Sequence, residues 1–381
     1  MDLLDKNILA VNIEKRAMEN IAAGKICGAS VLVCQNGETV YKNCFGTVSP
    51  LSDIPVDDST VYRIMSMTKP ITAVAAMIMI ERGLLSLDTP IEKYIPEFAV
   101  QEIMRENESG ELVPCGKAKT KITVFHLLTH TSGIGSRPIW EAQFRKMTAD
   151  DKKDLASSVK YFSRAGLAFE PFTIQAYSAN AAFATLGRII EIISGMNYND
   201  FLRENIFEPC GMKDTTFTPS AEQWARMIKM HNMKDGVAVE APSREGYISR
   251  DFPCTNFLGG SGLISTLEDY GNFAQMLLDG GVFGGRRIIS EESVKALGTP
   301  QIPEELQPGA ARWGLAMRVV VGKHRRPVGT YGWSGAYGTH FWVDPENGIT
   351  AVYMKNSLFD GGSGAITSAE FESDVYNSFK E

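Results

Sequence analysis

The sequence has no run of basic residues and no apolar stretch long enough to cross a membrane. Its densest basic segment is Lys323-His324-Arg325-Arg326, and the formal net charge of the 381 residues is −7, which disfavours nucleic-acid binding. The longest apolar stretch, Ile71 to Ile80, is shorter than the ~20 residues of a membrane-spanning helix. We therefore expect neither a nucleic acid nor a membrane as a partner.

Metal and phosphate motifs are missing as well. The six cysteines, at 27, 34, 44, 115, 210 and 254, show no C-x-x-C or similar spacing, so free, mostly buried thiols are expected. His126 and His130 are four residues apart, but no glutamate stands between them as in H-E-x-x-H, and zinc is disfavoured. Neither a G-x-S-x-G elbow nor a G-x-x-x-x-G-K-[ST] loop occurs. The sequence thus predicts no metal and no cofactor.

What is present is the composition of a folded, enzyme-sized protein, with 44% hydrophobic and 22% charged residues. The first residues, Met1 to Lys6, carry acidic side chains where a secretory signal has a basic stretch and then an apolar one. If Met1 is the native start, a cytoplasmic location is expected.

Residue patterning predicts a helix over 3–23 and then two strands, 28–32 and 39–41, joined by a type I′ turn at Asn36-Gly37. Further helices are predicted along the middle of the chain, at 66–82, 123–129, 153–163, 178–195, 198–207 and 266–279. The C-terminal part reads as strands and a closing helix, at 313–321, 330–334, 340–343, 350–354 and 366–379.

This order of elements predicts an α/β protein of the α+β kind. Both chain ends build one antiparallel sheet flanked by helices, and a mainly helical region is inserted between them. We expect residues 1–62 and 311–381 to form the sheet domain and residues 63–310 the helical domain, with the active site at their interface.

Ser66 and Lys69 stand three residues apart at the start of an apolar helix. On a helix this spacing brings the hydroxyl and the amine to one face, and burial lowers the pKa of a lysine so that it can take the proton of the serine. The same S-x-x-K pattern recurs at Ser157 and Lys160, but in a charged, solvated stretch where a lysine keeps its usual pKa. Ser66 is therefore the candidate nucleophile.

Pro70 suits the first turn of a helix, which places Ser66 near the helix N-terminus. The backbone N–H of Ser66 is then free to stabilise an oxyanion. On this segment alone, a purely structural role in which Ser66 only caps the helix is an equal alternative.

Ser66 to Pro70 and Gly83 to Asp88 resemble the nucleophile helix and exit turn of class C β-lactamases, D-Ala-D-Ala peptidases and family VIII carboxylesterases. Further segments that resemble this serine β-lactamase-like, penicillin-binding protein-like superfamily are Phe125 to Gly133, Leu258 to Thr266 and Gly338 to Pro345. The motif pattern is closest to the family VIII carboxylesterases. The resemblance implies the β-lactamase/transpeptidase-like fold and a serine hydrolase.

Ala176 to Asn180 resembles the second motif of these proteins, Y-x-N or Y-S-x. The resemblance implies that Tyr177 accepts the proton of the nucleophile, which requires a cation such as Lys69 to favour the phenolate. The alternative is a partly buried tyrosine at a helix start. Ala179 stands where β-lactamases have the motif asparagine, and Asn180 is one residue late, which turns it by about 100° on a helix. Efficient β-lactamase activity is therefore disfavoured, and Asn180 is a substrate-binding candidate.

The third motif of the β-lactamases, K-T-G or H-T-G, is replaced by Trp333-Ser334-Gly335. An indole in place of a cation favours a neutral acyl or alcohol group over a carboxylate, so these three residues are substrate-binding candidates. By resemblance, the N–H of Ala336 is the second oxyanion donor beside that of Ser66, and Gly335 lets the substrate approach closely.

Together these residues predict a serine hydrolase that cleaves carboxylic esters through an acyl-enzyme on Ser66, with Lys69 and Tyr177 as further catalytic residues. The expected substrate is a small-molecule ester or amide. The alternatives are a D-amino-acid peptidase, amidase or weak β-lactamase, an acyltransferase, and a non-catalytic scaffold.

Two loops, 134–150 and 230–256, are expected to line the pocket because binding residues are often carried on loops. Trp140, Tyr247 and Phe257 are the aromatic candidates in and beside these loops.

Overall fold

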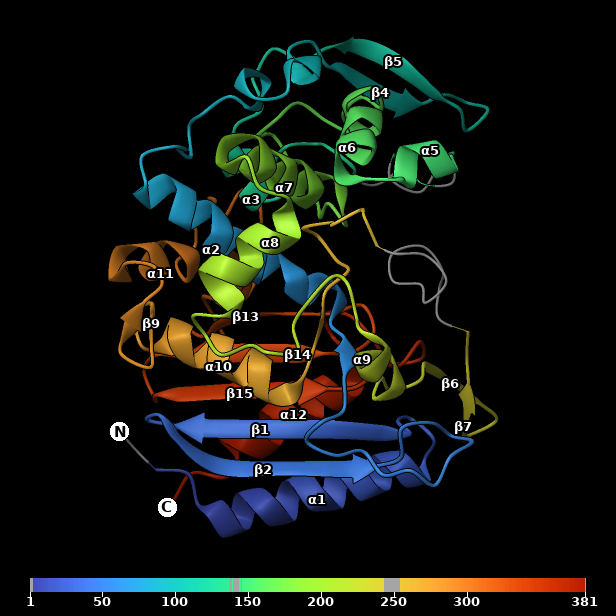
Figure 1. Cartoon of the computed structure of the whole chain (residues 1–381), viewed down its shortest axis with the longest axis vertical. Coiled ribbons are helices and arrows are strands. Elements are labelled where there is room, and N and C mark those ends of the chain that lie inside the picture. The colour runs from blue at the N-terminus through green and yellow to red at the C-terminus, as the bar shows by residue number, and fades with distance from the viewer. Residues whose placement is uncertain (1–2, 137–138, 140–143, 145, 243–253, 381) are drawn as a thin grey trace.

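A seven-stranded antiparallel sheet lies in the lower half of the molecule (Figure 1). The computed structural model describes residues 3–136, 139, 144, 146–242 and 254–380. In spatial order the strands are β11 (Ala311–Trp313), β12 (Arg318–Val320), β13 (Tyr331–Ser334), β14 (His340–Asp344), β15 (Ile349–Met354), β1 (Gly28–Gln35) and β2 (Glu38–Gly46). Strand β1 pairs with β15, so the two ends of the chain meet within the sheet.

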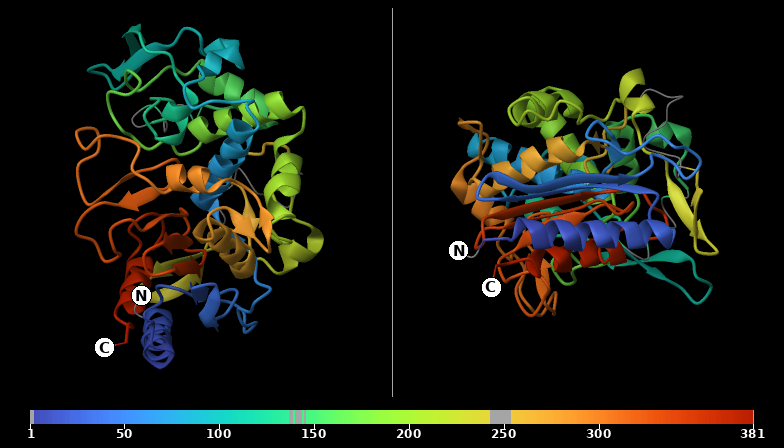
Figure 2. Two further views of the ribbon diagram at one scale, coloured as in Figure 1. Left: turned by 90° about the vertical axis from the view of Figure 1, so that its left-hand side faces the viewer. Right: turned by 90° about the horizontal axis from the view of Figure 1, so that it is seen from below.

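Helices cover both faces of this sheet. Helices α1 (Lys6–Ala22) and α12 (Ile366–Tyr376) lie side by side on one face, and α10 (Leu267–Leu278) lies on the other against β14 and β15 (Figures 1 and 2). The Asp5 carboxylate caps α1, since it accepts hydrogen bonds from the backbone N–H groups of Asn7 and Ile8. A smaller apolar core fills the space under α1 and α12, and a larger one on the α10 side continues into the helical region.

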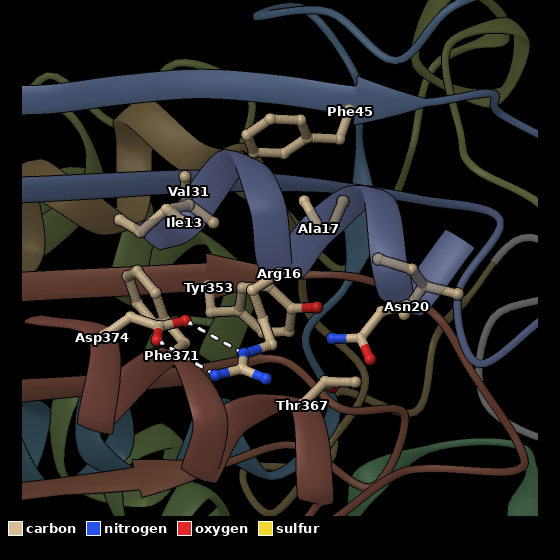
Figure 3. Close-up of a pocket in the computed structure, with 12 residues that line it drawn as sticks. Ile13, Arg16, Ala17, Asn20, Val31, Phe45, Tyr353, Thr367, Phe371 and Asp374 are labelled. Carbon is tan, nitrogen blue, oxygen red and sulfur yellow. Dashed lines mark hydrogen bonds and ion pairs between the residues drawn. The ribbon is translucent and has the colours of Figure 1, made fainter. Parts of the chain in front are cut away.

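A small cavity between α1 and α12 shows how closely this face is packed (Figure 3). Its volume is about 20 Å³ and its walls are mostly apolar, with Ile13, Val31 and Phe371 among them. Arg16 on α1 reaches Asp374 on α12, with 3.4 Å between Nε and Oδ2. A space of this size fits about one water molecule, so this cavity is no substrate site.

The helical region is built around α2 (Thr68–Glu81), which is buried along nearly its whole length and packs against α7 (Ala181–Ser194). The shorter helices of the described chain are α3 (Val124–Leu128), α5 (Ala149–Lys152), α6 (Leu155–Ser163), α8 (Tyr198–Leu202), α9 (Ala221–Ala225) and α11 (Glu291–Leu297), with a π-helical turn at Arg203–Phe207 and 3-10 turns at Met65–Met67, Ile91–Lys93 and Pro96–Phe98. None of the helices in the described ranges is long and apolar enough to cross a membrane.

Short strand pairs complete the described elements. These are β3 (Tyr62–Arg63) with β8 (Ile264–Ser265), β4 (Glu102–Glu106) with β5 (Leu112–Lys117), β6 (His231–Lys234) with β7 (Val237–Glu240), and β9 (Val282–Phe283) with β10 (Arg286–Arg287). The pairs β4–β5 and β6–β7 lie in parts of the sequence for which no strand was predicted.

Most predicted elements are present with shifted ends, but one prediction is wrong. Asn36 and Gly37 have φ of 55° and 80°, as the predicted type I′ turn requires. The strand predicted over 313–321 is in fact the hairpin β11–β12, which turns at 314–317, where Ala316 has φ of 68°. Apart from one glycine the residues of this turn are apolar. The turn therefore has few of the Gly, Pro, Asn, Asp and Ser residues by which a loop is predicted from sequence.

The sheet is built from both chain ends, with the helical region between them, as predicted. Helix α10 belongs to the stretch 63–310 and nevertheless covers the sheet, so the sheet layer draws on the middle of the chain as well. The domain boundaries at 62/63 and 310/311 stay a prediction. All six cysteines are thiols, as expected, but only Cys27 and Cys210 are fully buried.

Candidate active site

Ser66 lies in the 3-10 turn that joins β3 to the N-terminus of α2. Just before it, Met65 has φ of 47°, a conformation that is uncommon for a non-glycine residue and is found at functional sites. The Tyr270 hydroxyl holds the turn in place by donating a hydrogen bond of 2.7 Å to the carbonyl of Met67. Within the described chain the backbone N–H of Ser66 has no hydrogen-bond acceptor, so it is available to a ligand.

Lys69 is fully buried on the first turn of α2, and its amine touches three oxygen atoms. Nζ lies 2.6 Å from the carbonyl oxygen of Ala179, 2.7 Å from that of Gly260 and 3.3 Å from Oγ of Ser66. Burial lowers the pKa of Lys69 well below its ordinary value. A neutral amine directs its two hydrogens to the two carbonyls, so its lone pair faces Ser66. The geometry thus supplies a base for the serine.

Tyr177 comes from the loop before α7, and its hydroxyl donates a hydrogen bond of 2.8 Å to Oγ of Ser66. Burial raises the pKa of Tyr177 to about 12, and the hydrogen bond with Ser66 offsets this only in part. Nζ of Lys69 lies 4.9 Å from the centre of the phenol ring, but a neutral amine does not stabilise a phenolate. These surroundings favour the neutral phenol over the phenolate that the sequence resemblance implied.

Aromatic rings hold Tyr177 in position. Its ring centre lies 6.0 Å from that of Trp313 in a stacked arrangement, 5.4 Å from Trp333 and 4.6 Å from His130. His130 is fully buried, its Nδ1 accepts a hydrogen bond of 3.1 Å from the N–H of Ser178, and burial lowers its pKa well below the usual range. A neutral His130 therefore packs behind the phenol.

His126, the other histidine considered as a zinc ligand, lies on α3. Nδ1 of His126 accepts a hydrogen bond of 3.2 Å from the N–H of Thr123 at the start of α3. In the part of the chain that the structure describes, no group of three or more His, Cys, Asp or Glu side chains could hold a metal ion.

The segment after β13 faces the same cleft as Ser66. The backbone N–H of Ala336 has no hydrogen-bond acceptor among the described residues. Gly335 donates its N–H to the Thr339 carbonyl at 2.7 Å. A Cβ on Gly335 would lie 2.2 Å from Oγ1 of Thr339 and 2.4 Å from the carbonyl oxygen of Ile64, so only glycine fits beside the nucleophile turn.

These residues line an open cleft of about 460 Å³, a volume typical of small-molecule sites. The candidates found in its wall are Ser66, Tyr177, Trp333, Ser334 and Ala336, and the further lining residues are Gln175, Ala176, Gln307, Trp313, Arg318, Gly362 and Ser363.

Arg318 is a charged lining residue that the sequence analysis missed. It stands on β12 directly across from Gly332 on β13. Its Nη2 donates a hydrogen bond of 3.0 Å to the Ala311 carbonyl, while its buried Nε has no partner among the described residues. Burial, and then the charge of Arg326, lower its pKa. The cleft thus has a cation on the strand next to the one that carries Trp333. The register of this strand was hidden when β11 and β12 were predicted as one strand.

The remaining candidates lie elsewhere or outside the described residues. Asn180 is buried, and its Oδ1 accepts a hydrogen bond of 2.7 Å from Ser261; it is not part of the cleft wall. Phe257 packs against the larger apolar core. Trp140 and Tyr247 lie outside the described residues.

A serine in contact with a buried amine and a phenol, in a fold with a helix-flanked sheet, defines a serine hydrolase of the acyl-enzyme class. The chain belongs to the Beta-lactamase family, whose model matches residues 12–369. This match confirms the predicted superfamily and the β-lactamase/transpeptidase-like fold of α+β class.

The proteins similar to this chain include two named enzymes and one protein whose name states no activity. Protein Rv1367c of Mycobacterium tuberculosis is 30% identical over 355 residues, covering 87% of this chain and 86% of that protein. Esterase EstB of Burkholderia gladioli is 26% identical over 392 residues, covering 96% and 95%. The solved structure of simvastatin synthase LovD of Aspergillus terreus superposes with a TM-score of 0.81 at 21% identity, covering 98% of this chain and 99% of that one, which shows the shared fold.

Proposed function

We propose that this chain is a serine esterase that cleaves carboxylic esters of small molecules through an acyl-enzyme on Ser66. The observation that carries the proposal is the contact of Oγ of Ser66 with two proton-transfer groups, the phenol of Tyr177 at 2.8 Å and the amine of Lys69 at 3.3 Å. Membership of the Beta-lactamase family and the similarity to esterase EstB support it.

In the acylation step, neutral Lys69 takes the proton of Ser66 as Oγ attacks the ester carbonyl carbon. The carbonyl oxygen gains negative charge and accepts hydrogen bonds from the backbone N–H groups of Ser66 and Ala336. When the tetrahedral intermediate collapses, the bond to the alcohol oxygen breaks. The proton passes from Lys69 by way of Tyr177 to that oxygen, and the alcohol leaves.

Deacylation repeats these steps with water as the nucleophile, and Ser66 regains its proton when the acid leaves. An alcohol bound in place of water would turn the same acyl-enzyme into an acyltransferase reaction. The aromatic walls of Trp313 and Trp333 support a neutral, apolar group on the substrate.

The test is intact-protein mass spectrometry after incubation with p-nitrophenyl butyrate, together with the release of p-nitrophenol. We expect a butyryl adduct and turnover in the wild type, neither in Ser66→Ala, and both in Ser157→Ala, which removes the serine of the second S-x-x-K pattern. Folding is checked by circular dichroism. No adduct and no turnover in a folded wild-type sample would overturn the proposal.

Arg318 favours a second candidate, the hydrolysis of D-amino-acid peptides or amides that end in a free carboxylate. An arginine without a carboxylate partner in the described chain is suited to bind such a group. A matched pair of substrates, one with a free carboxylate and one with its methyl ester, separates the two candidates. A preference for the free acid that disappears in Arg318→Gln supports the peptidase, and a preference for the methyl ester supports the esterase.

A cytoplasmic location stays a prediction, as does the division of the chain into 1–62 with 311–381 and 63–310. The proposed partner is a small-molecule ester or amide. Fluorescence microscopy of a tagged full-length chain in its native host would test the location.

A further inference from the structure

Ser334, His340 and Glu372 form a continuous hydrogen-bonded chain behind the cleft. Oγ of Ser334 lies 2.8 Å from Nδ1 of His340, and Nε2 of His340 lies 3.0 Å from Oε1 of Glu372. The three residues are 6%, 5% and 4% exposed, and Ser334 is the member that lines the cleft. The acyl-enzyme mechanism uses neither His340 nor Glu372, so this arrangement needs its own explanation.

The series of hydrogen bonds ends at Glu372, whose side chain is an ionised carboxylate. Nε of Arg326 lies 3.0 Å from Oε1, and Nε of Arg325 lies 3.1 Å from Oε2. Burial alone would raise the pKa of Glu372, but the hydrogen bond from His340 and the two arginines lower it to about 2. A carboxylate has only acceptors, so the hydrogen between Glu372 and His340 belongs to Nε2 of the ring.

This fixes the direction of the next hydrogen bond. Burial lowers the pKa of His340 below its usual value, although Glu372 opposes the shift, so the ring is neutral and carries one hydrogen. With that hydrogen on Nε2, Nδ1 is an acceptor, and Ser334 donates its hydroxyl hydrogen to it. No other hydrogen bond of the Ser334 side chain occurs in the described chain, so its lone pairs are left for a ligand in the cleft.

We propose that Ser334 acts only as a hydrogen-bond acceptor in the cleft and thereby selects esters that carry an N–H or O–H donor near the scissile bond. The inference deepens the proposed esterase function and rests on it for the substrate class. A serine that can rotate freely either donates or accepts, whereas Ser334 has no hydrogen left for a carboxylate or carbonyl. His340 and Glu372 are positioning residues that act through Ser334.

The direction of the hydrogen bonds can be tested without turnover. Long-range ¹H–¹⁵N spectra of protein with ¹⁵N-labelled histidine report which ring nitrogen carries the hydrogen, and the His340→Gln variant identifies the signals of His340. We expect the neutral tautomer with hydrogen on Nε2 at neutral pH. A hydrogen on Nδ1, or on both nitrogens, would overturn the inference.

Substrate selection is tested with two matched pairs of esters. On the acyl side, p-nitrophenyl N-acetylglycinate has an N–H that the N-acetylsarcosinate lacks; on the alcohol side, 2-hydroxyethyl butyrate has an O–H that the 2-methoxyethyl ester lacks. After correction for uncatalysed hydrolysis, we expect kcat/KM to favour the donor member of one pair by roughly tenfold, because a buried acceptor left without a donor costs binding free energy.

Variants then separate selection from structure. Ser334→Ala should bring the ratio close to one. Glu372→Gln permits the other tautomer of His340 and should shrink the ratio while Ser334 is still present. The control, Glu370→Gln, makes the same change two residues earlier on α12, where Glu370 accepts a hydrogen bond of 2.9 Å from Asn20, and should keep the wild-type ratio.

The outcomes distinguish this inference from the proposed function. Turnover of p-nitrophenyl butyrate, measured in the same samples, tests the esterase itself. If butyrate is turned over but both pairs give ratios near one, or if the donor preference survives in Ser334→Ala, the selection by Ser334 is overturned and the esterase stands. If butyrate is not turned over, the esterase proposal fails, and the tautomer of His340 still decides whether Ser334 is an acceptor.

Discussion

Tyr177 and Ser66, 111 residues apart in the sequence, are joined by a hydrogen bond of 2.8 Å in which the phenol is the donor. The contact forms because Lys69, three residues after Ser66, is bound to the carbonyls of Ala179 and Gly260. One buried amine thus holds together the three segments that carry the nucleophile, the phenol and the glycine-rich stretch.

Replacing Tyr177 by phenylalanine should lower kcat/KM for p-nitrophenyl butyrate by roughly 10²- to 10⁴-fold, the range for losing a proton-transfer group. The ring keeps its packing against Trp313 and His130, so the fold should be retained. Tyr94→Phe is the matched control, because the Tyr94 hydroxyl donates to the Leu84 carbonyl and neither residue lines the cleft. A Tyr177→Phe enzyme within threefold of the wild type would contradict the role of the phenol.

The pH dependence of kcat/KM should report the amine of Lys69. Burial lowers its pKa, and only the neutral amine accepts a proton, so activity should fall with decreasing pH as one proton binds. Because the pKa is lowered, this fall should lie below the usual lysine range near ~10.4. The measurement is kcat/KM of a neutral ester across pH, with protein folding checked at each point. Activity that rises as the pH falls would contradict the assignment of Lys69 as the base.

Gly335→Ala should destabilise the protein by about 1–3 kcal/mol, the usual cost of overpacking, and should reduce turnover. The added Cβ would meet Oγ1 of Thr339 at 2.2 Å and the Ile64 carbonyl at 2.4 Å, which pushes the segment carrying Ala336 away from the nucleophile turn. Urea unfolding and p-nitrophenyl butyrate turnover measure the two effects. Gly322→Ala is the control, since its nearest neighbour would be at 3.6 Å; equal effects of both substitutions would refute this explanation.

Lys355→Met should destabilise the protein by roughly 3 kcal/mol, because it leaves the carboxylate of Asp360 without its cation in a buried site. Nζ of Lys355 lies 2.7 Å from Oδ2 of Asp360, and Lys355 is fully buried. The double variant Lys355→Met/Asp360→Asn removes the unpaired charge and should recover part of the loss. Thermal unfolding measures the stability of the two variants. A double variant less stable than Lys355→Met would count against the ion-pair argument.

The sequence predicted the parts of the site that depend on local spacing. Ser66 and Lys69 are three residues apart on a strongly apolar helix, and this pattern alone places a hydroxyl beside an amine. Tyr177 came from its resemblance to a family motif. The resemblance to this motif also led to Asn180, which directly precedes α7 but accepts a hydrogen bond from Ser261 instead of lining the cleft.

The parts that escaped prediction depend on contacts between distant elements. Arg318 reaches the cleft because β12 pairs with β13 in one particular register, and the apolar turn between β11 and β12 concealed that strand. The hydrogen bonds from Ser334 through His340 to Glu372 connect two neighbouring strands, β13 and β14, with the last helix, α12. No spacing along the sequence shows which face of α12 meets the sheet.

The pairing of β1 with β15 has a consequence for how the protein is made. Ser30 pairs with Met354, and Gln35 with Ile349, so one edge of the N-terminal hairpin has no partner until this much later segment of the chain has been synthesised. Unpaired strand edges invite association with other chains, and contacts this distant in sequence form slowly. The nascent chain therefore exposes this edge during synthesis, and we expect its yield in expression to vary with the speed of translation and with the supply of chaperones.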